Sequence, residues 1–295
     1  MVDARPLTFG TLNMNPNPLM STAILRAHLD DPLWIVIDCR FNLMDTEAGR
    51  RTYRESHLPG ARYAHLDHDL SSPATPTTGR HPLPDPARLA QTLGAWGVSN
   101  ATQVIAYDDL GGMLAAARLW WLLRWLGHER VAVLDGGFPA WQRAGLPLTA
   151  ELPTAQPATF TAQVNDQLWL TTAQVLALPP ENVVLDARGA ARFRGEMEPV
   201  DPVAGHIPGA VNLPTENNLT ADGEFLPQAE LRARFATALG ERPPTSVVHS
   251  CGSGVTACHN LLAMEVAGLH GSRLYAGSWS EWIRDPERPV AIGAE

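Results

Sequence analysis

The stretch VVHSCGSGVTACHNLLAMEV at residues 247–266 contains a complete strand, turn and helix signal. Its two leading valines predict a buried parallel strand, and residues 255–266 predict a helix. The glycines between them, Gly252 and Gly254, can adopt backbone angles that other residues avoid. This order is typical of α/β proteins, in which ligands bind beyond the carboxyl ends of the strands.

One thiol, Cys251, stands where this strand ends and the turn begins. Backbone N–H groups and the positive end of the helix dipole favour an anion at such a position. Because the thiolate is the nucleophilic form of cysteine, this placement predicts a reactive thiol. The alternative is that Cys251 is a small buried core residue, as free cysteines often are. The flanking glycines and the strand-end position favour the reactive thiol.

The composition limits the classes of function. The chain has 295 residues, 45% hydrophobic and 18% charged, which suits about two domains with a core in each. A formal net charge of -9 argues against binding to nucleic acid or to an anionic membrane surface. An anionic substrate must therefore be attracted by a local basic cluster. No apolar run of about 18 residues predicts a transmembrane helix.

Cysteine usage and the first residues predict a cytoplasmic protein. Residues 1–20 lack the basic start and apolar core of a secretory signal, and Met20 is an alternative start to Met1. The three cysteines are odd in number and widely spaced, which fits a reducing compartment. They form no metal-binding spacing with histidines, so no metal or other cofactor is expected.

Two halves of the chain carry the same signals in the same order, which predicts a duplicated domain. Each half has an apolar strand ending in Asp-x-Arg and then a His-x-Pro-Gly-Ala turn. A second apolar strand and a glycine turn with tryptophans follow in both. The paired segments are 34–40 and 183–188, 57–61 and 206–210, 103–107 and 246–250, and 134–141 and 275–282. The repeated His57 and His206, and the strand-end Asp38 and Asp186, are expected to be structural, and Arg188 is expected to pair within its domain.

Helical patterns lie between these strand signals, at 114–126, 230–239 and 255–266. The alternation predicts two tandem domains, each a mostly parallel sheet flanked by helices on both faces. The expected divisions are a loose leader at 1–20, a first domain at 21–146, a proline-rich linker at 147–160 and a second domain at 161–295. The tryptophans at 120, 121 and 125 are expected in the core or the interdomain seam. Basic residues are not interleaved with them, which argues against a base-stacking surface.

The first half lacks the thiol. Asp108 aligns with Cys251 and is followed by Asp109. A carboxylate pair at a helix start is a possible acid/base site, but capping of the helix is the preferred interpretation. The other cysteines, Cys39 and Cys258, are expected in the core. Two helical turns separate Cys258 from Cys251, which is long for a direct disulfide between them.

The paired HxPGA turns, the loop CGSGVTA at 251–257 and GSWSEW at 277–282 resemble the tandem-domain rhodanese sulfurtransferases over roughly residues 21–290. Within them, CGSGVT is similar to the loop of 3-mercaptopyruvate sulfurtransferases, whereas the thiosulfate branch has basic residues in place of Gly252 and Ser253. The resemblance implies a silent first domain, an active second domain, a site at their interface and a persulfide carried on the cysteine.

The same resemblance implies roles for individual residues. Cys251 matches the sulfur-accepting nucleophile, and Arg192 matches the arginine that holds the donor's anionic group. Ser253 matches a loop serine whose histidine and aspartate partners come from the first domain. The best matches for these partners are His81 and Asp67.

The chain departs from the family pattern at residue 201. Mercaptopyruvate enzymes commonly have a second arginine about nine residues after the one that matches Arg192, and here position 201 is an aspartate. Either Arg194 supplies the second cation from the same loop, or the carboxylate clamp is weaker. The usual Tyr-Asp-Gly-Ser-Trp motif also has Ala276 in place of the aspartate, which is expected to affect support of the site only.

The loop after Cys251 is expected to bind the donor. Residues Gly252, Gly254, Val255 and Thr256 are expected to curl so that several backbone N–H groups face the sulfur. Because Gly252 and Ser253 are uncharged, a monoanionic keto acid fits better than the dianion thiosulfate. The expected donor is therefore 3-mercaptopyruvate, with thiosulfate as the alternative, and the expected acceptor is a thiol, cyanide or a thioredoxin-like dithiol.

Two other classes share some of these signals. A cysteine phosphatase needs an arginine closing its loop, and here residues 256 and 257 are Thr and Ala. A sulfur carrier without turnover has the same fold and cysteine, so only kinetics separates it from an enzyme.

Overall fold

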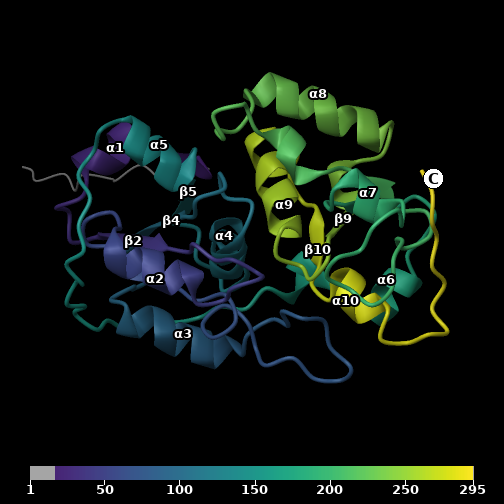
Figure 1. Cartoon of the computed structure of the whole chain (residues 1–295), viewed down its shortest axis with the longest axis horizontal. Coiled ribbons are helices and arrows are strands. Elements are labelled where there is room, and N and C mark those ends of the chain that lie inside the picture. Colours follow the sequence, from purple (N-terminus) through teal and green to yellow (C-terminus); the bar gives the residue numbers. More distant parts are fainter. Residues whose placement is uncertain (1–16, 295) are drawn as a thin grey trace, which may run out of the picture.

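The computed structural model describes residues 17–294, in which two sheets of five parallel strands are the framework (Figure 1). The first sheet has the order β1-β5-β4-β2-β3. Its strands are β1 (Leu19–Met20), β2 (Trp34–Asp38), β3 (Arg62–Tyr63), β4 (Gln103–Tyr107) and β5 (Val131–Leu134). Its helices are α1 (Thr22–Ala27), α2 (Ala48–Glu55), α3 (Pro86–Ala95), α4 (Ala115–Trp125) and α5 (Gly137–Arg143).

The second sheet repeats this arrangement with the order β6-β10-β9-β7-β8. Its strands are β6 (Trp169–Leu170), β7 (Val183–Asp186), β8 (Val211–Asn212), β9 (Val247–Ser250) and β10 (Arg273–Tyr275). The α-helices are α6 (Thr172–Leu176), α7 (Ala190–Phe193), α8 (Gln228–Leu239), α9 (Ala257–Val266) and α10 (Ser278–Trp282). Three short 3-10 helices complete it: η1 (Asp166–Leu168), η2 (Thr215–Asn218) and η3 (Pro244–Ser246). The predicted duplication and α/β fold are confirmed.

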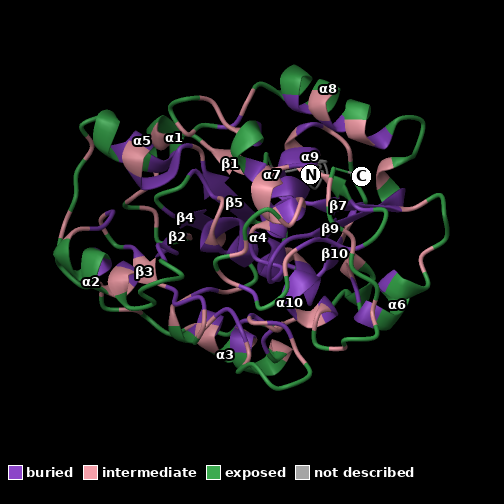
Figure 2. Cartoon of the chain, turned by 45° about the vertical axis from the view of Figure 1, so that its right-hand side comes forward, coloured by how far each residue is buried: buried purple, intermediate pink, exposed green. Residues whose placement is uncertain are grey.

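Alternate residues of each central strand face opposite layers of helices, because successive strand side chains point to opposite faces. In β4, Val104 and Ala106 pack into one core cluster, whereas Ile105 and Tyr107 pack into another. The first cluster contains residues of α3, α4, α8 and α9 and joins both domains. The outer clusters contain α1, α2 and α5 in one domain and α6, α7 and α10 in the other. Buried residues therefore fill the centre of the molecule (Figure 2).

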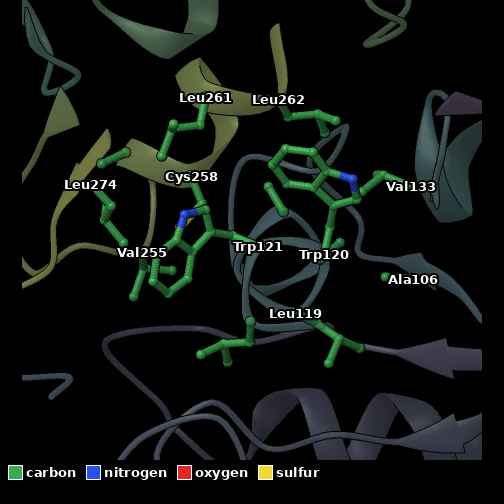
Figure 3. Close-up of a cluster of buried hydrophobic side chains, with 14 of the residues drawn as sticks. Ala106, Leu119, Trp120, Trp121, Val133, Val255, Cys258, Leu261, Leu262 and Leu274 are labelled. Atoms are coloured by element: carbon green, nitrogen blue, oxygen red, sulfur yellow. The ribbon is translucent and has the colours of Figure 1, made fainter. Parts of the chain in front are cut away.

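The tryptophans of α4 lie in the interdomain seam. Trp120 and Trp121 are buried and point between Val133 of the first domain and residues of α9, including Cys258 (Figure 3). The expected place of these tryptophans in the core or seam is confirmed, as is the core position of Cys258. The two domains therefore share one apolar core, and the position of the first domain relative to Cys251 is fixed by packing.

The strand-end Asp-x-Arg signals are ion pairs within each domain. Arg40 Nη2 donates to Asp38 Oδ2 at 2.6 Å, and Arg188 Nη2 donates to Asp186 Oδ2 at 2.7 Å. These pairs confirm the structural role expected for them. The repeated histidines also tie turns together, since His57 Nδ1 lies 2.6 Å from the carbonyl oxygen of Tyr53.

The structure adds detail to the predicted leader at 1–20 and the predicted linker at 147–160. Residues 1–16 of the predicted leader lie outside the described residues, and its last two residues form β1 at the edge of the first sheet. The stretch 147–160 has no regular element and runs along the first domain, where Thr149 bridges to His57. Within residues 17–294, every helix is too short or too polar to cross a bilayer.

Candidate active site

Cys251 directly follows β9, and the loop it begins is held against the start of α10. The Cys251 N–H donates to Ser278 Oγ at 3.0 Å, and its carbonyl accepts the Trp279 N–H at 3.0 Å. The next carbonyl, that of Gly252, accepts the Ser280 N–H at 2.8 Å. These bonds fix the thiol at the end of the central strand.

The curl of the loop requires glycine at residue 254. Its φ is 76°, and a Cβ there would lie 2.2 Å from the carbonyl oxygen of Ala276. This turn aims the Gly254 N–H at Cys251 Sγ, 3.2 Å away. Several such donors were expected, but this is the single hydrogen bond to the sulfur among residues 17–294. Helix α9 begins only at Ala257, and none of its N–H groups bonds the sulfur.

The sulfur is buried but opens into a cavity. Cys251 is 2% exposed, yet it lines a cavity of about 220 Å³ at the junction of the two domains. Apolar side chains of the first domain form one wall: Phe41, Leu43, Leu66 and Leu114. The opposite wall is the loop itself, to which Gly252, Ser253, Val255 and Thr256 contribute. The thiol therefore borders a space large enough for a small molecule.

A hydrogen-bonded chain of side chains crosses the domain interface beside the thiol. Ser253 Oγ lies 2.7 Å from His81 Nδ1, and His81 Nε2 lies 3.1 Å from Asp67 Oδ1. A carboxylate can only accept, so His81 donates from Nε2, and Nδ1 accepts the Ser253 hydroxyl. Burial lowers the pKa of His81, and the hydrogen bond from His81 lowers the pKa of Asp67. The structure thus brings together the three residues that the resemblance grouped.

Arg192 also lines the cavity, at the end of α7. Its Nη2 donates to Glu198 Oε1 at 2.6 Å and lies 3.2 Å from Asp201 Oδ2. The expectation for Arg194 needs correction, because this side chain does not line the cavity. It points to solvent, where its Nε donates to Glu196 Oε1 at 2.6 Å. Neighbouring residues of one helical turn face different directions, so proximity in sequence did not place Arg194 at the site.

Two arginines of the first domain reach the site and were not predicted from the sequence. Arg80 lines the cavity beside Arg192. Arg118 is fully buried in α4, and its guanidinium donates to the carbonyl oxygens of Gly254 at 3.0 Å and His81 at 3.2 Å. Burial lowers the pKa of Arg118, and the nearby Cys258 opposes this effect. The apolar run of α4 contains two arginines, Arg118 and the part-buried Arg124, and the sequence alone does not tell which of them is buried at the site.

One group of side chains has the composition of a metal site. Glu47, His65 and His68 place ligand atoms within 4.8 Å of one another, and His65 is buried. However, His65 Nδ1 accepts the N–H of Asp67 at 3.1 Å. In neutral histidine the proton is then on Nε2, which lies 3.3 Å from Glu47 Oε1 without a hydrogen bond between them. The nitrogen that a metal would need is therefore protonated.

Comparisons with known proteins agree with this architecture. The rhodanese-like domain model matches residues 21–144 and 171–285. The chain is 51% identical to a probable 3-mercaptopyruvate sulfurtransferase of Pseudomonas aeruginosa, over 95% of this chain and 100% of that protein. It is 39% identical to SseB, a putative thiosulfate sulfurtransferase of Mycobacterium tuberculosis, over 89% of this chain and 92% of that protein.

Solved structures give the same result. The 3-mercaptopyruvate sulfurtransferase of Leishmania major is 34% identical with a TM-score of 0.80, over 91% of this chain and 75% of that one. SseA of Escherichia coli, a 3-mercaptopyruvate sulfotransferase, is 33% identical with a TM-score of 0.78, over 90% of this chain and 100% of that one. The chain therefore belongs to the rhodanese-like family and is a sulfurtransferase with two tandem rhodanese-like domains.

Proposed function

We propose that the chain transfers a sulfane sulfur from 3-mercaptopyruvate to a thiol, cyanide or a thioredoxin-like dithiol, through a persulfide on Cys251. The observation that carries this proposal is the placement of the thiol. Cys251 Sγ opens into a small cavity whose lining includes Ser253, His81, Glu216 and three arginines, Arg80, Arg188 and Arg192. Such a cavity suits a donor with one anionic group and one carbonyl.

In the first half-reaction, the Cys251 thiolate attacks the sulfur of the donor. A bond forms between Sγ and this sulfur as the donor's carbon–sulfur bond breaks, and the electron pair of that bond makes the enolate of pyruvate. The methylene carbon then gains a proton and the outer sulfur loses one, so no proton is consumed overall. The product is pyruvate and a persulfide anion on Cys251.

The neighbouring side chains have separate roles in this step. Arg192 binds the donor's carboxylate, because a guanidinium matches a carboxylate in charge and shape. The Ser253 hydroxyl donates to His81 in the free site, and it turns its single proton to the enolate oxygen to stabilise the negative charge there. A donor of this kind contributes roughly 3 kcal/mol in well-studied oxyanion sites. Since burial lowers the pKa of His81, this histidine stays neutral near pH 7 and keeps its acceptor for Ser253.

In the second half-reaction, the acceptor attacks the outer sulfur and Cys251 leaves as a thiolate. Cyanide becomes thiocyanate, and a thiol becomes a persulfide. A dithiol closes to a disulfide and releases hydrosulfide. The scheme is ping-pong, because pyruvate leaves before the acceptor reacts. The described cysteines are all unpaired, which fits the expected reducing cytoplasm.

Thiosulfate remains the alternative donor, since relatives carry both names. The kinetic test compares kcat/KM for 3-mercaptopyruvate and thiosulfate in the wild type, Cys251→Ser and Cys258→Ser. We expect wild-type preference for 3-mercaptopyruvate and a loss of at least about a thousandfold in Cys251→Ser. Cys258 is the matched control, because it is also buried nearby but does not line the cavity. Pyruvate release that stops after one equivalent would instead indicate a carrier.

A further inference from the structure

The cationic side of the cavity is built from both domains. Arg192 comes from α7 of the second domain, and Arg80 comes from the first-domain loop that precedes α3. The Arg80 loop is docked on α10, where its N–H donates to Ser280 Oγ at 3.1 Å. Gly79 makes this approach possible, because a Cβ there would lie 2.6 Å from the carbonyl oxygen of Gly277. Arg80 is therefore held at the cavity by its backbone.

Both guanidinium groups face the residue that follows the thiol. A Cβ built on Gly252 would lie 2.8 Å from Arg80 Nη2 and 3.7 Å from Arg192 Nη2. The resemblance places basic residues on the loop itself in thiosulfate enzymes. In this chain the loop is neutral at Gly252, and the cations reach the same space from neighbouring elements.

Asp201 lies between these two arginines. Arg80 Nη1 pairs with its Oδ1, and Arg192 Nη2 lies 3.2 Å from its Oδ2. The Asp201 side chain is 3% exposed, and burial raises its pKa. The Nε of Arg80 is also buried, and among residues 17–294 it has no hydrogen-bond partner. The Asp201 carboxylate thus lies between the two guanidinium groups, and the Nε–H of Arg80 is left as a further donor.

We propose that Arg80 is a specificity-determining residue that binds the donor's carboxylate together with Arg192, and that Asp201 competes with the donor for both arginines. This inference rests on the proposed function. Arg80 and Arg192 carry two positive charges; Glu198 pairs with Arg192 alone, whereas Asp201 pairs with both arginines. Since Coulomb energy is proportional to charge, Asp201 penalises the dianion thiosulfate more than the monoanion 3-mercaptopyruvate. Asp201 therefore contributes to the choice of donor.

Two substitutions with opposite expected signs test this. Arg80→Gln should lower kcat/KM for 3-mercaptopyruvate about tenfold or more, mainly by raising KM, because a contact to a charged group is lost. Arg80→Lys should recover part of the loss, because the charge remains. Asp201→Asn should raise kcat/KM, and more for thiosulfate than for 3-mercaptopyruvate. This gain cannot arise from misfolding.

If the Arg80–Asp201 pair only braces the structure, both substitutions remove the brace and both lower kcat/KM, and that result would overturn the proposal. Arg194→Gln is the matched control, because it removes an exposed arginine near Arg192, and we expect a change within about twofold. Binding of pyruvate to Cys251→Ser, with and without Arg80→Gln, reports the carboxylate contact without sulfur transfer. Equal pyruvate affinities would contradict the role of Arg80, whereas failure of wild-type turnover would contradict only the proposed function.

Discussion

The loops that follow the central strands of the two domains differ in what occupies them. Tyr107 pairs with Asp38 in the first sheet, and Ser250 pairs with Asp186 in the second, so Asp108 and Cys251 stand at equivalent positions. In the first domain, the Asp108 carboxylate accepts N–H groups from residues of its own loop and of α4: Leu110 at 3.0 Å, Gly112 at 2.8 Å, Leu114 at 3.1 Å and Ala116 at 3.3 Å. In the second domain, the sulfur accepts one N–H and opens into the cavity.

This difference explains why one domain is expected to be silent. Asp108 is fully buried, and its carboxylate accepts N–H groups of its loop and of the first turn of α4, although the N-cap residue of this helix is Leu114. Burial raises the pKa of Asp108 to about 6, although its hydrogen bonds oppose the rise. The same strand-loop-helix unit thus directs N–H groups at an acceptor in both domains. In the first domain the acceptor is a buried carboxylate, whereas in the second it is a thiol that lines a cavity.

The largest effect is expected from making the second loop resemble the first. Cys251→Asp should abolish sulfur transfer, because a carboxylate cannot accept sulfur, while its oxygens can accept the Gly254 N–H as Asp108 accepts its donors. We expect loss of at least about a thousandfold in turnover with little change in Tm. Pyruvate release and calorimetry measure the two effects. Retained turnover would show that the chemistry does not depend on residue 251.

A substitution at the equivalent residue of the first domain, Asp108, should affect stability rather than sulfur transfer. Asp108→Ala leaves four N–H groups without their partner, two of them buried and two part-buried, and unsatisfied buried donors cost about 1–3 kcal/mol each before the loop relaxes. We expect a loss of about 3 kcal/mol or more in the free energy of unfolding. Asp108→Asn is the control, since it keeps one acceptor and should lose less. An unchanged denaturation midpoint would rule out the capping role.

The strands before these loops differ at one residue, and we expect this residue to make the folding stability depend on pH. His249 of β9 stands where β4 has Ala106, and burial lowers its pKa to about 3 from 6.5. The unfolded chain therefore binds a proton below pH 6.5 that the folded chain does not. As the pH is lowered from 6.5 toward 3, this group should therefore reduce the free energy of unfolding by about 1.4 kcal/mol per pH unit. Asp108 has the opposite sign, since its raised pKa lowers stability as pH rises from 3.8 to about 6.

His249→Ala copies the first domain and should flatten the loss of stability between pH 6.5 and 4. Urea denaturation at several pH values measures the slope for the variant and the wild type. The cavity that the substitution creates lowers the free energy of unfolding equally at every pH, so it does not change the slope. Equal slopes would mean that His249 is already protonated in the folded protein.

The sequence predicted the fold because the signals that define it are local and repeated. Apolar strands, glycine turns and Asp-x-Arg pairs occur in both halves, and each is decided by neighbouring residues. The grouping of Ser253, His81 and Asp67 came from the family resemblance, and the structure brings these side chains into contact.

The cations of the site were not predictable in the same way. Arg80 reaches the cavity because its loop docks on α10 of the other domain, which no local pattern indicates. Arg194 was expected there from sequence proximity alone, but it is the C-cap residue of α7, pairs with Glu196 and does not line the cavity. Asp201 was read as a missing arginine, whereas its structural feature is the contact with Arg80 and Arg192.

The most direct test of the contrast between the two loops is peptide mass spectrometry after treatment with 3-mercaptopyruvate alone. We expect one added sulfur atom on the peptide that contains Cys251, lost again on addition of cyanide, and none on the peptides that contain Cys39 or Cys258. Sulfur on another cysteine, or on none while pyruvate is released, would contradict the account.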